Sequence, residues 1–131
     1  MEHISLIISS AIASLILFQS LIVAPYINGL LKKEDASVFL RVIWPKFFVM
    51  IGTLGLLGFG AEILNSEMLF SFFFLSGSLM MLLCYLITAS INKAKDNSKL
   101  SLWKLLHSLT IILTLAVLIL NLLFIYFRCI R

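Results

Sequence analysis

The sequence predicts an all-α, membrane-embedded four-helix bundle with short loops, folded as one domain over residues 1–131. Two observations support this: 62% of the residues are hydrophobic, and only 12% are charged, against the ~25% usual in soluble domains. A soluble fold of ~150 residues buries only ~70% of the surface that its unfolded chain exposes, too little to hide this much apolar surface. Composition therefore excludes an ordinary cytosolic enzyme and a disordered chain.

The first span is predicted over residues 4–27, because no charged residue occurs between Ile4 and Leu31 and ~20 apolar residues cross a bilayer. A cleaved signal peptide is not expected, since the segment before the apolar run carries Glu2 and no Lys or Arg. Pro25 removes one backbone hydrogen bond near the end of this span. We therefore expect a helix bend at Pro25.

The second span, predicted over residues 42–62, is the weakest. Fifteen uncharged residues separate Lys46 from Glu62, and they give only ~22 Å of helix. A helix counted from Val42 is long enough to cross the bilayer if Lys46 extends its ammonium group back to the headgroups. Pro45 allows two alternative structures at the start of the second span. Either residues 36–44, capped by Asp35, form an interfacial helix that bends into the membrane at Pro45, or one helix continues through a kink. The pattern favours the bend.

The third and fourth spans are predicted over residues 68–90 and 104–127. Neither the run from Met68 to Asn92 nor the run from Leu105 to Phe127 contains Asp, Glu, Lys or Arg. The segment between them, residues 91–101, is rich in Asn, Lys, Asp and Ser, which is typical of a solvated loop.

Basic residues predict the orientation. Eight of the ten lie on or beside the first and third connections, and only Arg128 and Arg131 lie on the other side. Because basic loops stay in the cytoplasm, loops 32–36 and 91–101 are expected to be cytoplasmic and both termini outside. Trp44 and Trp103 fall at the predicted cytoplasmic boundary, where indole rings prefer to lie. The +4 net charge is thus a topology signal, and no nucleic-acid partner is expected. The eight are Lys32, Lys33, Arg41, Lys46, Lys93, Lys95, Lys99 and Lys104.

A polar stripe on the fourth span is the main candidate for function. His107, Thr110, Thr114 and Asn121 stand at offsets 0, 3, 7 and 14, on one helical face. The stripe has two interpretations. It either forms hydrogen bonds between helices or lines a polar path, since ionisable groups at membrane depth are rarely accidental.

Gln19 and Lys46 belong to the same cytoplasmic half of their helices as His107. If the bundle brings these side chains together, they form a polar, cationic pocket that opens inward. Gly52, Gly55, Gly58 and Gly77 are interpreted instead as helix-packing positions, because small residues allow backbones to approach closely.

No metal or other cofactor is expected. His3 and His107 are predicted to lie roughly a membrane thickness apart, so they cannot share one haem. Cys84 and Cys129 are also predicted to lie too far apart for a disulfide or a shared copper ion. The sequence contains no Ser-His-Asp set, phosphate-binding loop or HExxH motif. These observations predict a protein that is not an enzyme.

Three segments suggest a family relation. They are Val23-Ala24-Pro25, followed by Phe39-Leu40-Arg41-Val42-Ile43-Trp44-Pro45-Lys46-Phe47-Phe48, and Leu102-Trp103-Lys104-Leu105-Leu106-His107-Ser108. The chain resembles small four-span membrane proteins of unknown function related to the human transmembrane protein linked to cisplatin resistance. In that family a Pro ends the first helix, a Phe-Pro-x-Phe-like motif begins the second, and a Leu-His pair begins the fourth.

The resemblance covers about half of the chain and points to Pro25, Pro45 and His107. The chain departs from the family pattern at Gln19-Ser20, where glycine is frequent, and it has Thr114 and Asn121 instead of an Asn two turns after the His. The resemblance implies a bacterial inner-membrane protein with no established reaction.

Together these observations predict a multi-pass, non-enzymatic inner-membrane protein that forms an oligomeric transport path or a scaffold. The alternative is an accessory subunit of a larger respiratory or transport complex in the membrane. The expected partners are the lipid bilayer and either further copies of the chain or a membrane-complex partner.

Overall fold

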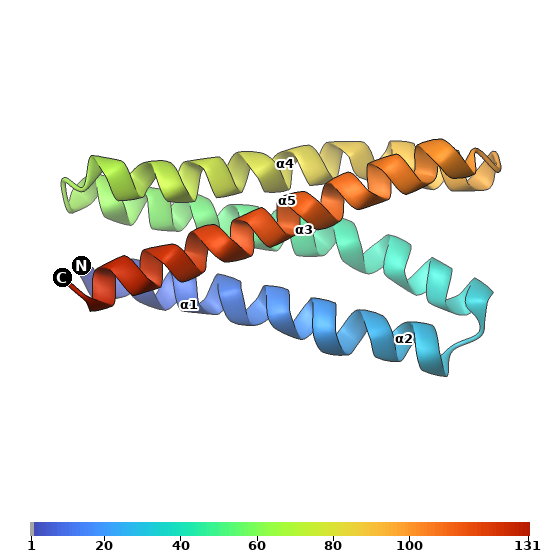
Figure 1. Cartoon of the computed structure of the whole chain (residues 1–131), viewed down its shortest axis with the longest axis horizontal. Coiled ribbons are helices and arrows are strands. Elements are labelled where there is room, and N and C mark those ends of the chain that lie inside the picture. The colour runs from blue at the N-terminus through green and yellow to red at the C-terminus, as the bar shows by residue number, and fades with distance from the viewer. Residues whose placement is uncertain (1) are drawn as a thin grey trace.

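Four long helical rods, each antiparallel to the one before it in the chain, form the computed structural model, which describes residues 2–131 (Figure 1). Each rod is long and apolar enough to cross a membrane. This confirms the predicted all-α, four-helix fold. The first rod consists of three helical segments in succession, and each of the other three is a single helix. The elements are α1 (Glu2–Phe18), η1 (Gln19–Val23), α2 (Ala24–Leu30), α3 (Lys33–Leu64), α4 (Met68–Asp96) and α5 (Leu100–Cys129).

The first rod changes its hydrogen-bond pattern one turn before Pro25. The segment η1 is a π-helix, and the backbone N–H of Ala24, which follows it, donates to the carbonyl of Gln19, five residues back. Pro25 has no N–H with which to satisfy the carbonyl of Leu21. The wider π turn accommodates that loss, and the helix continues through Pro25 to Leu30.

The helix α3 passes through Pro45 without interruption, so the favoured prediction of a separate interfacial helix over residues 36–44 is wrong. Asp35 is not an N-cap either, because α3 begins at Lys33 and Asp35 lies in its first turn. Packing on both sides of the proline explains the continuity. The Trp44 ring stacks against Phe48 at 5.6 Å and meets Phe47 edge-on at 5.5 Å, and these phenylalanines are buried.

The loops are shorter than the sequence suggested. They comprise only residues 31–32, 65–67 and 97–99, so most of the predicted loops 32–36 and 91–101 is helical. The second and third turns each contain a serine in the left-handed region, Ser66 at φ 59° and Ser98 at φ 56°. Tertiary packing extends the helices beyond the apolar runs, since Ala36 and Ala94 are both buried.

One end of the bundle lies where α1 begins and α5 ends (Figure 1), and charged side chains form ion pairs there. We call Glu62, Glu67, Arg128 and Arg131 the clamp. Arg128 lies 2.7 Å from the wholly buried Glu62 carboxylate, and Arg131 lies 3.0 Å from Glu67. The Arg128 guanidinium also lies 4.9 Å from the centre of the Phe70 ring. The clamp therefore ties α5 to the end of α3 and to the start of α4 at this closed end.

Close backbone packing joins α3 and α4 in the middle of the bundle. A Cβ atom on Gly55 or Gly58 would overlap Ser78 or Phe74 on α4, whereas at Gly52 or Gly77 it would make ordinary contacts. The predicted glycine face is therefore buried inside one chain. Ser78 Oγ, which donates to the Gly52 carbonyl at 3.0 Å, adds a hydrogen bond between the same helices. This packing leaves Gly55 and Gly58 without surface for a second copy.

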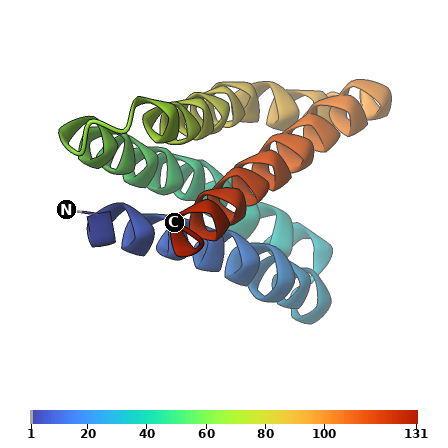
Figure 2. The same cartoon turned by 60° about the vertical axis from the view of Figure 1, so that its left-hand side comes forward.

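The opposite end of the bundle is splayed (Figure 2). At the closed end, Ser9 Oγ donates to Asn121 Oδ1 at 2.7 Å and joins α1 to α5. Further along, within residues 2–131, neither η1 nor α2 approaches α5 closely, although α2 still contacts α3. An ion pair between Arg41 and Asp96 links α3 to α4 here. The first rod and α5 thus diverge toward this open end.

The contact at Gly58 generates a stability prediction. Gly58→Ala should lower the free energy of unfolding by about 1–3 kcal/mol relative to Gly60→Ala, because the new methyl group overlaps the buried Phe74 ring. Gly60 faces open space, so its substitution is a matched control for the gain in helix propensity. Unfolding in detergent micelles measures both variants. Equal stability of the two would contradict this packing.

The ion pairs at the two ends should differ in their effect on stability. Glu62→Gln leaves Arg128 without its buried counter-charge, and breaking a buried pair removes about 3–5 kcal/mol of stability. Asp96→Asn breaks an exposed pair, in which water solvates the remaining charge, so its effect should be much smaller. The same unfolding assay compares them. A loss for Asp96→Asn as large as that for Glu62→Gln would disprove the difference.

Candidate functional site

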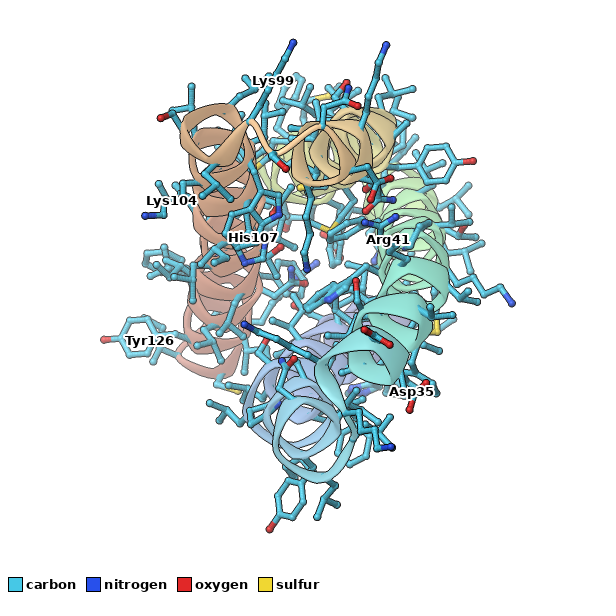
Figure 3. All side chains as sticks on the ribbon, turned by 90° about the vertical axis from the view of Figure 1, so that its right-hand side faces the viewer. Asp35, Arg41, Lys99, Lys104, His107 and Tyr126 are labelled. Carbon is cyan, nitrogen blue, oxygen red and sulfur yellow. The ribbon has the colours of Figure 1, made fainter. Side chains whose placement is uncertain are left out.

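A cavity of about 580 Å³ lies between the diverging helices at the open end. We call it the basic pocket, and every helical rod contributes to its wall. Figure 3 looks onto this end, where Arg41 and His107 point toward the space between the helices and Lys99 and Lys104 point away from it. The charged and aromatic residues that line it are Lys33, Arg41, Trp44, Phe48, Lys95, Trp103 and His107.

The pocket has a positive lining. Lys33, Arg41 and Lys95 contribute three cations, and no Asp or Glu of the described chain lies among its lining residues. Arg41 is partly neutralised by a two-bond pair with Asp96, at 3.1 Å and 2.5 Å. Within residues 2–131, Lys33 and Lys95 form no ion pair. Their charges are therefore available to an anion in the pocket.

One wall of the pocket is a stack of three side chains. Trp103 and His107 are four residues apart on α5, so they share a face, and their rings stack in parallel at 5.2 Å. The Lys95 ammonium from α4 lies 5.6 Å from the centre of the Trp103 ring. This cation–π contact places the lysine beside the indole and holds α4 close to α5 at the mouth.

The deeper part of the pocket has few hydrogen-bond donors. Thr110 donates to the carbonyl of His107 at 2.7 Å, Thr114 to that of Thr110 at 2.7 Å, and Thr88 to that of Cys84 at 2.8 Å. Since each hydroxyl proton is bonded within its own helix, these side chains offer the pocket only acceptors. The pocket is therefore cationic at its mouth and weakly polar below.

The pocket ends at about half the depth of a bilayer. From Trp103 to Thr114 is eleven residues, or ~16 Å along α5, against ~30 Å for the hydrocarbon core. Below it, Met81 and Val117 are packed almost without exposure. A second void beside Asn121 measures about 10 Å³, no larger than one water molecule. In this conformation the pocket has an opening at one end of the bundle and a packed floor.

The predicted pocket residues divide into two groups. His107, Thr110 and Thr114 line the basic pocket, whereas Asn121 lies at the closed end, bonded to Ser9. The first two turns of the stripe on the fourth span therefore line the pocket. Further along the helix, the stripe packs against α1. Asn121 thus forms a hydrogen bond between helices, as one interpretation of the stripe expects, and the interpretation of the other three residues as the lining of a polar path stays a prediction.

Gln19 and Lys46 do not line the pocket. Gln19 is buried, with no acceptor for its Nε2 within the described chain, and Lys46 is exposed on α3. The π turn that begins at Gln19 shifts the helical register after it. As a result Ser20, Ala24 and Asn28 face the pocket from the first rod.

Sequence reasoning missed the three cations and both tryptophans of the pocket. The sequence pattern predicts Lys33, Arg41 and Lys95 only as orientation signals, and the tryptophans only as membrane-interface residues. A usable signal was present, because Lys33, Ser37, Arg41, Trp44 and Phe48 recur at helical spacing along one face. That basic and aromatic face distinguishes pocket residues from other charges at the same end.

No metal-binding group is evident in the described part of the chain, since no three His, Cys, Asp or Glu side chains there lie together. Cys84 is buried and Cys129 is exposed, and both are free thiols. What the pocket presents is therefore cationic, aromatic and hydroxyl chemistry, which suits the binding of an anion.

Comparison with protein-family models, with curated proteins and with solved structures found no match for this chain. The resemblance to the family related to the cisplatin-resistance protein therefore stays a prediction.

Proposed function

We propose that the protein is a non-enzymatic, multi-pass protein of the bacterial inner membrane whose basic pocket binds an anionic ligand from the cytoplasm. In this proposal the pocket is the inward-facing binding site of a transport path. The observation that carries the proposal is a cavity with a cationic mouth, open at one end of an apolar bundle, over a packed floor.

The charge distribution supports an open end that faces the cytoplasm. Lys33 and Lys95 at this end form no ion pair within residues 2–131, in keeping with loops that stay in the cytoplasm. At the closed end, Arg128 and Arg131 are paired with Glu62 and Glu67. Both termini then lie outside, and an anion from the cytoplasm meets the lysines first.

The clamp supports a transport path that is closed on its outer side. Passage of a ligand would require the buried pair between Glu62 and Arg128 to separate, because this pair joins α3 to α5 at that end. An oligomer would need contacts other than the buried glycine face, and the oligomeric state stays a prediction. A stoichiometric partner chain that covers the pocket would favour an accessory subunit instead.

The two natural cysteines provide a test of orientation. Cys129 is exposed near the C-terminus and Cys84 is fully buried, so a membrane-impermeant maleimide should label intact spheroplasts through Cys129 alone. Cys129→Ser should abolish the label. Adding Ser98→Cys, at the open end, should restore labelling only after permeabilisation. Labelling in the reverse order would place the open end outside.

Charged thiol reagents test the pocket itself without knowledge of the ligand. Ser37 lines the pocket, whereas Ser66 lies in the turn beside Glu67. In Cys129→Ser protein, Ser37→Cys should react faster with a negatively charged methanethiosulfonate than with a positively charged one. Relative to Ser66→Cys the preference should be about tenfold or more, because surface potentials in clefts reach several kT. No preference at position 37 would refute an anion-binding pocket.

A further inference from the structure

The basic pocket has a second opening, on the side of the bundle. Ile111 and Leu115 on α5 line the pocket, yet they are 48% and 50% exposed. Across from them, within residues 2–131, neither η1 nor α2 approaches α5 closely. The pocket is therefore open laterally between α2 and α5. In a bilayer this side faces the lipid chains rather than water.

The chemistry of the pocket changes along this opening. Lys33, Arg41 and Lys95 line the pocket together with Trp44 and Trp103, and these residue types favour the headgroup level of a membrane. Below them the wall contains Phe48, Ile111 and Leu115, with threonines whose protons are already bonded. A ligand that satisfies both parts has an anionic head at the mouth and an apolar chain below it.

The size and position of the pocket favour a membrane lipid over a small soluble anion. A volume of about 580 Å³ is within the ~300–1,000 Å³ usual for ligand sites, whereas a lone phosphate would leave the apolar lower wall in contact with water. A lipid already holds its phosphate at the height of the tryptophans. Its chain can reach Ile111 and Leu115 sideways without leaving the hydrocarbon.

We propose that the basic pocket binds one anionic phospholipid, with its phosphate group between Lys33, Arg41 and Lys95 and an acyl chain leaving between α2 and α5. This inference rests on the proposed function, because it names the class of anion that the same pocket takes. Arg41 is held in place by Asp96, and the two unpaired lysines supply most of the preference for negative charge.

Native mass spectrometry of the whole protein in detergent tests this inference, with phosphatidylglycerol compared with phosphatidylcholine of the same chains. Phosphatidylglycerol should bind at least tenfold more tightly, at one copy per chain. Lys33→Gln with Lys95→Gln should weaken its binding about 30-fold, since each basic group at a membrane surface contributes ~1 kcal/mol toward anionic lipid.

The matched control is Lys99→Gln with Lys104→Gln. These substitutions remove the same charge from the same end of the bundle. The side chains of Lys99 and Lys104, however, point away from the pocket (Figure 3). This pair should leave lipid binding within about twofold of the wild type. An equal loss from both pairs would overturn the inference, because it would show attraction to general surface charge. The variant with Lys33→Gln and Lys95→Gln should have the same free energy of unfolding in phosphatidylcholine as the wild type. This result would show that the variant is folded.

Glycerol phosphate separates failure of this inference from failure of the proposed function. It carries the same phosphate chemistry without acyl chains. If it binds as tightly as phosphatidylglycerol, the ligand is a soluble anion and the lipid inference fails, while the proposed function stands. If the thiol reagents show no charge preference at Ser37→Cys, the anion-binding function itself fails.

Discussion

The buried ion pair between Glu62 and Arg128 is the constraint on which the rest of the structure depends. A carboxylate with no exposed surface is tolerated only beside its counter-charge, so separation of α3 from α5 at the closed end would leave a buried charge unpaired. Arg131 and Glu67 extend the same contact to the start of α4. Three rods are therefore held at one end. Divergence of the rods can occur only toward the other end.

The basic pocket follows from that asymmetry together with the attachment of the first rod. Ser9 joins α1 to Asn121 near the closed end. Beyond the π turn, within residues 2–131, the first rod contacts α3 and does not approach α5 closely. Leu115 and Ile111 are left uncovered on α5 as a result. The lysines that favour a cytoplasmic loop then line a cavity. One set of charges would thus serve both the predicted membrane orientation and the proposed ligand binding.

Local sequence rules failed where tertiary contacts were stronger. A proline interrupts one backbone bond, yet α3 continues through Pro45 because Trp44, Phe47 and Phe48 pack across the interruption. Buried Ala94 keeps α4 helical where composition indicated a loop. The helical wheel grouped His107 with Asn121 correctly on one face. It contained no information on depth, which separates a pocket residue from a packing residue.

The sequence by itself determined the number of helices, their approximate limits and the unequal distribution of basic residues between the two ends. These depend on the length of apolar runs and on the placement of charges, which are properties of the chain alone. Only the tertiary structure decided which rods are in contact along their whole length and which diverge toward one end. That choice depends on single contacts between distant segments, such as Glu62 with Arg128 and Ser9 with Asn121. The pocket exists because no such contact joins α2 to α5 within residues 2–131.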